Sequence, residues 1–196
     1  MLSFNEQLNI LIKNALQEDV GDGDHSALCC IPADAKGKAV LKIKQDGLLA
    51  GMDIARRIFH FKEPGATFTE YKKDGDLMKP GDVAFEVSAS VHSILQCERL
   101  VLNCMQRMSG IAALTNQYVD RLKGYRTKVL DTRKTTPNFR LLEKEAVRIG
   151  GGVNHRMGLY DMIMLKDKHI DFCGGIEPAI ERAHVYVQKI KPGLKI

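Results

Sequence analysis

The sequence predicts an α/β protein: a small N-terminal α+β sandwich domain, residues 1–105, followed by an incomplete α/β (TIM-like) barrel, residues 106–196. Three observations support this prediction. Strand-like segments are mixed with helical patterns in the first half of the chain. In the second half, short apolar runs alternate with amphipathic segments. A complete barrel takes about 200–250 residues, so the second half can hold only the first strand–helix units.

The N-terminal half opens with a helix. Ser3 and Glu6 form a capping-box pattern, and apolar residues then recur on one helical face to about Asp19. Residues 21–24 are acidic and glycine-rich. We interpret them as a turn, because a calcium loop needs more oxygen ligands at fixed spacing. Further along we expect a helix at residues 52–61 and strands at residues 38–44, 67–71 and 83–88.

A long helix is expected from Ser90 to about residue 123, with a break at Ser109 and Gly110. Cys97 and Cys104 lie one heptad apart on its apolar stripe, and we interpret them as core thiols. The chain has five cysteines and no CxxC spacing. This pattern argues against a zinc site or a disulfide framework and favours a reducing, cytoplasmic location.

The barrel segment is expected to alternate strands with helices. We predict strands at residues 127–130 and 161–165, helices at residues 139–149 and 176–188, and the start of another strand at residues 195–196. The charged residues of the first of these helices are interpreted as a solvated, ion-paired face: Glu143, Lys144, Glu145 and Arg148.

Three basic clusters follow strand-like runs or glycine-rich turns. They contain Arg133 and Lys134, His155 and Arg156, and Lys166. Barrels carry their catalytic and binding groups just past the C-terminal ends of the strands. Arginine can hold a carboxylate or phosphate through two parallel hydrogen bonds. The pattern therefore favours a pocket for a small anion, with ordinary solvated surface charges as the alternative.

Composition narrows the class of protein. Hydrophobic residues make up 44% and charged residues 27% of the chain, which is typical of a globular protein. No apolar run approaches the ~20 residues of a membrane span, and the N-terminus lacks a secretory signal pattern. A net charge of +5 is compatible with nucleic acid, but aromatic residues are only 6%. We expect neither a nucleic-acid nor a membrane partner, because small-anion binding explains the charge better.

The stretch from Asp131 to His169 resembles the quinolinate phosphoribosyltransferase family, also called carboxylating nicotinate-nucleotide pyrophosphorylases. The resemblance is carried by residues 131–137 (DTRKTTP), 150–152 (GGG) and 154–159 (NHRMGL), and by Lys166, Asp167 and His169. Upstream, residues 18–24, 98–103 and 109–115 match as well. Two positions depart from the family pattern: Ala113 replaces a usual threonine, and Lys168 a usual asparagine.

The resemblance implies phosphoribosyl transfer from phosphoribosyl pyrophosphate to quinolinate with decarboxylation, a step of NAD biosynthesis that yields nicotinate mononucleotide, pyrophosphate and CO2. It implies that Mg²⁺ accompanies phosphoribosyl pyrophosphate, and that the protein is a homodimer in which Arg99 reaches the neighbouring active site. A glutamate, an aspartate and a phosphate loop are expected beyond Ile196. The implied substrate-binding residues are Arg99, Thr132, Arg133, Lys134, His155, Arg156 and Lys166, with catalytic roles for Lys134 and Lys166.

Two other functions stay open at this point. One is a truncated, non-catalytic relative that dimerises or binds anions. The other is a related phosphoribosyltransferase that does not decarboxylate its substrate. The second would keep the phosphate-binding cations without needing a clamp for two carboxylates.

Overall fold

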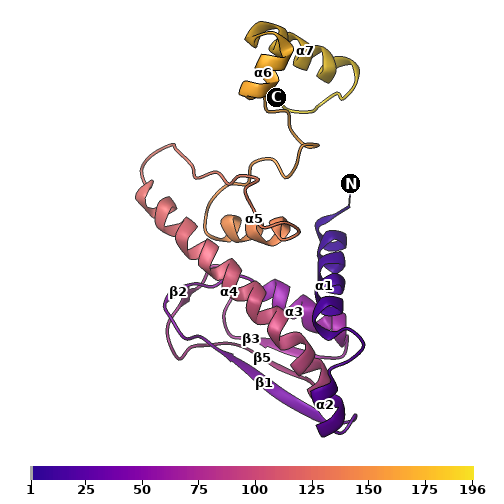
Figure 1. Cartoon of the computed structure of the whole chain (residues 1–196). Helices are drawn as coiled ribbons and strands as arrows, with labels where there is room; N and C mark the ends of the chain where they lie inside the picture. The colour runs from indigo at the N-terminus through magenta and orange to yellow at the C-terminus, as the bar shows by residue number, and fades with distance from the viewer. Residues whose placement is uncertain (1) are drawn as a thin grey trace. The chain divides into compact units, whose positions relative to one another are not determined.

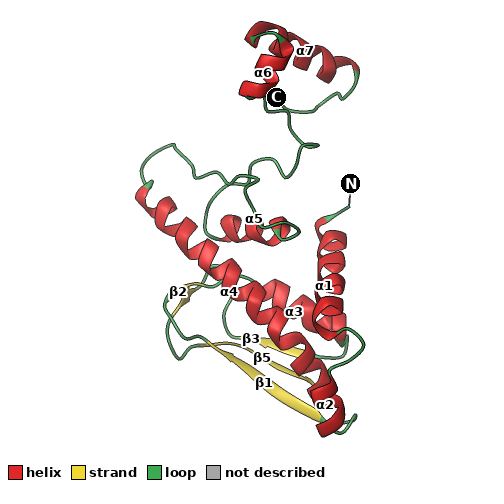
Figure 2. Ribbon diagram, in the orientation of Figure 1, coloured by secondary structure: helices red, strands yellow, loops and turns green. Residues whose placement is uncertain are grey.

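The computed structural model describes residues 2–196, and the chain divides into two compact units. One unit comprises the described residues as far as Asp131 together with Thr135–Val153. The other comprises Thr132–Lys134 and Asn154–Ile196. Figure 1 traces the chain, and Figure 2 distinguishes its helices, strands and loops.

The first unit holds most of the regular secondary structure. Its elements are α1 (Phe4–Val20), α2 (His25–Cys30), β1 (Lys36–Lys42), β2 (Gly47–Leu48), α3 (Met52–Lys62), β3 (Thr67–Glu70), β4 (Leu77–Met78), β5 (Val83–Ser90), α4 (Val91–Arg121) and α5 (Arg140–Ile149). The predicted capping box of Ser3 and Glu6 is present at the start of α1. The helices and strands predicted before Ser90 are confirmed to within a few residues, and α2, β2 and β4 are additional to them.

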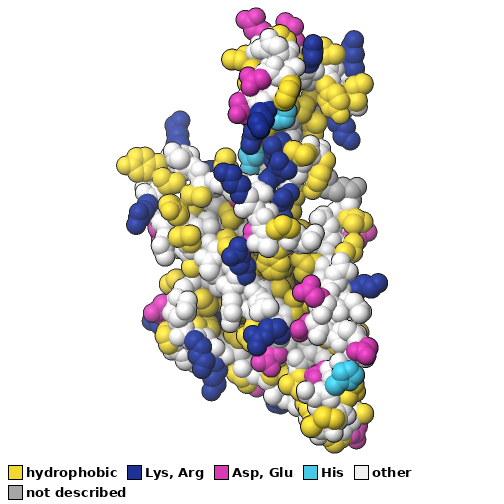
Figure 3. Space-filling model, viewed as in Figure 1, with side chains coloured by type: hydrophobic (Ala, Val, Ile, Leu, Met, Phe, Trp, Pro, Cys, Tyr) yellow, Lys and Arg dark blue, Asp and Glu magenta, His cyan; other side chains and the backbone are white. Residues whose placement is uncertain are grey.

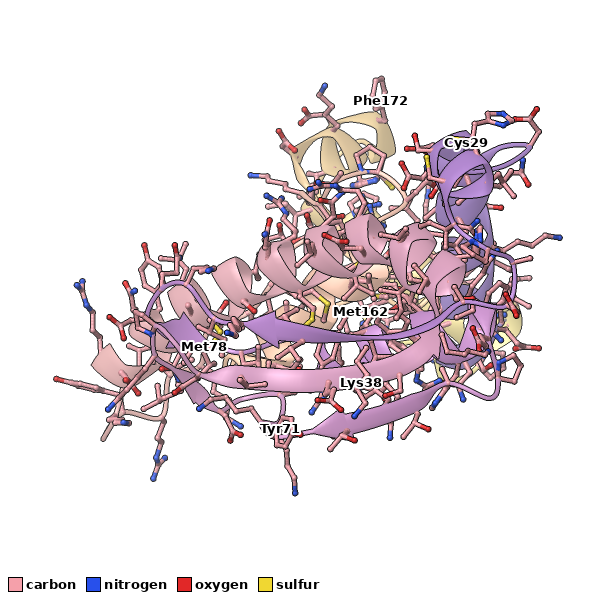
Figure 4. The ribbon with its side chains drawn as sticks, turned by 90° about the horizontal axis from the view of Figure 1, so that it is seen from below. Cys29, Lys38, Tyr71, Met78, Met162 and Phe172 are labelled. Atoms are coloured by element: carbon pink, nitrogen blue, oxygen red, sulfur yellow. The ribbon has the colours of Figure 1, made fainter. Side chains whose placement is uncertain are left out.

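A three-stranded antiparallel sheet in the order β1-β5-β3 forms the β layer of this unit. Helix α4 packs against the sheet, whose strands lie side by side in Figure 4, and α3 packs on α4. The ring centroid of Phe59 in α3 lies 6.1 Å from that of Phe68 and 6.2 Å from that of Phe85. The rings of Phe68 and Phe85 stack with their centroids 4.4 Å apart. Because aromatic rings bury large apolar areas, this cluster fixes the predicted α+β layer.

Helix α4 runs through Ser109 and Gly110 without interruption, so the predicted break is wrong. The buried Ser109 hydroxyl accepts the Ala50 N–H at 3.0 Å and donates to the Ala50 carbonyl at 3.2 Å. Tertiary packing thus overrides the weak helix propensity of this pair. Cys97 and Cys104 are buried in the same helix as predicted, and burial raises the pKa of each thiol to about 12.

Glu63 joins the end of α3 to the start of α4. Its carboxylate accepts hydrogen bonds from the Ser90 N–H at 3.0 Å and from Lys36 Nζ at 3.1 Å. The Ser90 N–H, together with Ser93 and Lys36, lowers the pKa of Glu63 from 4.5 to about 2. A lowered pKa in the folded state stabilises the fold fully above the unfolded value, here 4.5, and the contribution disappears as the pH falls toward 2.

We therefore expect Glu63→Gln to lower the free energy of unfolding at neutral pH. The difference in this free energy between the variant and the wild type should disappear as the pH falls from 4.5 to 2. Urea titrations followed by circular dichroism measure this gap. Glu70→Gln is the control, because Glu70 lies 3.7 Å from Arg56 in a looser pair. A gap that stays constant over the acidic range would contradict the role given to Glu63.

The second unit contains α6 (Asp167–Cys173) and α7 (Ile176–Lys189), which pack together. Helix α7 confirms the prediction for residues 176–188, and α6 is additional to it. No helix of the described residues is long and apolar enough to cross a membrane.

The strands predicted at residues 127–130 and 161–165 are wrong as extended elements. Among the described residues they are represented by isolated parallel bridges: Leu130 to Val153 in the first unit, and Met162 to Lys195 in the second. Parallel strands are normally buried on both faces. Leu130 is 54% exposed, so this run lacks the covering layer that would extend its pairing.

Candidate functional site

The predicted binding residues separate cleanly between the two units. Six belong to the second unit: Thr132, Arg133, Lys134, His155, Arg156 and Lys166. Arg99 belongs to the first unit, where it is exposed on α4. Figure 3 shows Lys, Arg and His side chains gathered over the loop that precedes α6. The chain therefore brings segments from two separate parts of the sequence into one basic unit.

Arg156 is the buried cation of this unit, with 7% of its surface exposed. Its Nη1 donates to the Met162 carbonyl at 3.2 Å, and it forms no salt bridge with any described residue. The turn that follows is held by Asp161, whose carboxylate accepts the N–H groups of Met157 at 2.6 Å and Gly158 at 2.8 Å. A buried guanidinium without a carboxylate is unfavourable by itself, so the site is suited to an anionic ligand.

Lys166 is exposed at the N-cap of α6. Its backbone N–H donates to Nδ1 of His169 at 3.1 Å, so this histidine shapes the start of the helix. Lys168, one of the two departures from the family pattern, is exposed on the same helix.

The segment Thr132-Arg133-Lys134 forms a turn in which the Lys134 N–H donates to Oγ1 of Thr132 at 3.1 Å. Arg133 is half-buried, whereas Thr132 and Lys134 are exposed. The turn gives this segment a defined backbone shape.

The glycine run before His155 combines close packing with a positive φ. A Cβ on Gly150 would lie 2.5 Å from the Ala112 carbonyl oxygen, and one on Gly152 would lie 2.7 Å from Cγ1 of Val147. Gly151 has a φ of +89°, which side chains disfavour. Close packing and positive φ therefore hold the chain in a tight turn shortly before His155 and Arg156.

The main correction concerns α5. Glu143 and Lys144, predicted to be solvated, are only 6% and 2% exposed. Helix α5 packs on α4, and this packing buries its first turn. The buried charges are tolerated because each has an opposite partner, Arg107 for Glu143 and Asp131 for Lys144. Glu145 and Arg148 do form the predicted exposed pair.

Among the described residues, no group of three or more His, Cys, Asp or Glu side chains could hold a metal ion.

The layered first unit and the basic second unit define an α/β protein with a buried cation. Residues 24–109 match the model of the quinolinate phosphoribosyl transferase N-terminal domain, and residues 111–196 match that of the C-terminal domain. A crystal structure of NadC from Streptococcus pyogenes superimposes with a TM-score of 0.88 and 43% identity, covering 100% of this chain and 68% of that one. The chain belongs to the quinolinate phosphoribosyltransferase family, which confirms the predicted resemblance and fold class.

Named relatives agree with this assignment. The chloroplastic carboxylating nicotinate-nucleotide pyrophosphorylase of Arabidopsis thaliana is 44% identical over 93% of this chain and 52% of its own length. A probable enzyme of the same name from Bacillus subtilis is 42% identical over 90% of this chain and 61% of its own length. The chain spans about half the length of the curated relatives it matches.

The domain boundary at residues 105 and 106 stays a prediction. It lies inside α4, four residues before the N-terminal family model ends at residue 109, whereas the compact units divide at other positions.

Proposed function

We propose that this chain takes part in phosphoribosyl transfer from phosphoribosyl pyrophosphate to quinolinate, with decarboxylation to nicotinate mononucleotide, pyrophosphate and CO2. One observation carries the proposal: Arg156 is 7% exposed and has no salt-bridge partner among the described residues. A ligand carboxylate would supply the missing negative charge. The names of the relatives give the reaction that fits such a ligand.

Quinolinate carries two neighbouring carboxylates, so a single cation cannot neutralise it. Arg133, His155 and Arg156 belong to one unit and supply donors for both groups. The planar fork of an arginine matches a carboxylate with two parallel hydrogen bonds. Thr132 adds a hydroxyl in the same segment. We assign these four residues to binding quinolinate, with Arg99 of a second subunit completing the clamp.

Lys134 and Lys166 are assigned to the phosphates. When the ring nitrogen bonds to the sugar, pyrophosphate leaves with the bonding electrons, and an ammonium group nearby stabilises the charge that develops. The bonded ring nitrogen is then cationic. As CO2 departs, the electron pair of the broken bond stays on the neighbouring ring carbon, where the positive nitrogen stabilises it, and a proton from water then binds that carbon to give nicotinate mononucleotide. Mg²⁺ would arrive with the diphosphate and keep several waters.

The proposal includes a homodimer and a cytoplasmic location. Arg99 is exposed on α4, in the unit that lacks the other proposed binding residues, and a second copy would bring it to a neighbouring site. Sedimentation velocity of the 196-residue chain tests the dimer. The five free cysteines support a reducing compartment, although the Arabidopsis relative is named chloroplastic.

The expected result with carboxyl-labelled quinolinate and phosphoribosyl pyrophosphate is release of labelled CO2, with nicotinate turned over more slowly by about fivefold or more. Nicotinate has one carboxylate, so it would leave part of the clamp unpaired, a loss of about 1–3 kcal/mol. Ligand-observed NMR of quinolinate alone tests binding without requiring turnover.

The other outcomes are equally informative. Quinolinate binding without CO2 release would identify a non-catalytic anion binder. Turnover of nicotinate as fast as that of quinolinate, or faster, would identify the non-decarboxylating alternative. If neither pyridine binds, the proposed substrate class is wrong.

A further inference from the structure

Two buried charged residues of α5 hold the chain on both sides of the segment Thr132-Arg133-Lys134. Lys144 contacts Asp131, directly before this segment, and Glu143 contacts Thr136, two residues after it. All four contacting residues belong to the first unit. Adjacent positions of one rigid helix therefore fix both ends of a short chain segment.

The hold on the N-terminal side is a buried ion pair. Lys144 Nζ lies 2.5 Å from Oδ1 of Asp131, and the two side chains are 3% and 6% exposed. The backbone of Asp131 is fixed as well, because its N–H donates to the Val153 carbonyl at 3.2 Å. Since Val153 in turn donates to the Val129 carbonyl at 2.8 Å, the residue before Thr132 is held through both its side chain and its main chain.

The hold on the C-terminal side is a hydrogen-bond network around Glu143. Oε1 accepts from Oγ1 of Thr136 at 2.9 Å and from Nη2 of Arg107 at 2.7 Å, while Oε2 accepts the Thr136 N–H at 3.2 Å. Burial alone would raise the pKa of Glu143, but the bonds from Arg107 and Thr136 lower it overall. The carboxylate is therefore ionised at neutral pH and has partners on both oxygens.

We propose that Glu143 and Lys144 are positioning residues that set the place of Arg133 and Lys134 for the anionic substrate. The proposal rests on the proposed function, because it gives the held segment its ligand. Glu143 and Lys144 act through the backbone of the held segment. A displacement of about 1 Å in a binding group can weaken a reaction or a complex by up to about 100-fold, so such a clamp matters for affinity.

Glu143→Gln is the test. The amide NH2 group would face Arg107 and Thr136, which both donate hydrogen bonds to the Glu143 carboxylate. We expect the Kd of the 196-residue chain for quinolinate, measured by ligand-observed NMR, to rise about tenfold. Glu145→Gln is the matched control: it also loses an arginine partner on α5, but its side chain is 25% exposed and contacts Arg148. Its Kd should change less than about twofold.

Thr136→Val provides a second route if Glu143→Gln folds poorly. Thr136 is exposed, so the change spares the core while removing the hydroxyl that Glu143 binds. We expect its Kd for quinolinate to rise in the same direction.

A double-mutant cycle separates positioning from general damage. If Glu143 acts through Arg133, then Glu143→Gln should add little in an Arg133→Gln background. An additive penalty there, or a Glu143→Gln chain that binds quinolinate like Glu145→Gln, would overturn the clamp. If Arg133→Gln itself leaves quinolinate binding unchanged, the failure lies in the proposed function instead.

Discussion

Replacing Lys144 by methionine is expected to lower the free energy of unfolding by about 3–5 kcal/mol. The pair of Lys144 and Asp131 is almost fully buried, at 3% and 6% side-chain exposure. Loss of the ammonium removes the Lys144 ion pair from the Asp131 carboxylate, which lies in a poorly solvated place. Urea titration followed by circular dichroism measures the change, which should appear as a lower midpoint with little change in slope.

Arg148→Met is the matched control on the same helix. Arg148 also pairs with a carboxylate at 2.5 Å, but its side chain is 63% exposed, so its removal should cost less than about 1 kcal/mol. A double change of Lys144→Met with Asp131→Leu removes both buried charges and should recover part of the lost stability. Equal losses for Lys144→Met and Arg148→Met would show that burial does not set the strength of this pair.

The fold of the first unit could be predicted because its signals are local. Ser3 and Glu6 sit three residues apart and form the capping box that the pattern implies. The alternation around Ala39 and Leu41 describes a strand with one covered face, and the strand forms at residues 36–42. Such elements depend on neighbours within a few residues, which the sequence displays directly.

Elements that depend on distant packing could not be predicted in the same way. A glycine after Ser109 is compatible with a break or a continuous helix, and the hydrogen bonds of Ser109 with Ala50 settle the choice. The apolar runs at residues 127–130 and 161–165 have strand-like composition, but parallel pairing requires covering layers on both faces. The sequence of a run does not reveal whether those layers are present.

The site shows the same division. Motifs predicted Arg133, Arg156 and Lys166 as site residues because cations after glycine- or proline-rich turns are recognisable in sequence. The clamp of Glu143 and Lys144 was missed because adjacent charges on an amphipathic helix are usually exposed. The sequence does contain a residue of opposite charge for each: Arg107 for Glu143 and Asp131 for Lys144. Matching these partners to α5, however, requires knowledge of the tertiary structure.

Arg156→Met is expected to abolish high-affinity quinolinate binding, raising the Kd about 30-fold or more, since a buried charged contact with a ligand is typically worth about 2–5 kcal/mol. The same change should alter the free energy of unfolding of the ligand-free chain by less than about 1 kcal/mol. It removes one hydrogen bond to Met162, worth about 1 kcal/mol, and also removes a buried charge that has no salt-bridge partner among the described residues. Arg156→Met should thus change the Kd strongly and the free energy of unfolding little, whereas Lys144→Met should lower the free energy of unfolding strongly.

Arg182→Met on α7 is the control for lost charge, because Arg182 is exposed in the same unit; it should leave the Kd for quinolinate nearly unchanged. The contrast between Lys144 and Arg156 follows from one physical distinction. A buried cation with a protein carboxylate holds the fold, whereas a buried cation without one is unfavourable until an anion arrives. An Arg156→Met chain that loses several kcal/mol of stability and keeps its affinity for quinolinate would assign Arg156 to the fold and remove the main support for the proposed substrate.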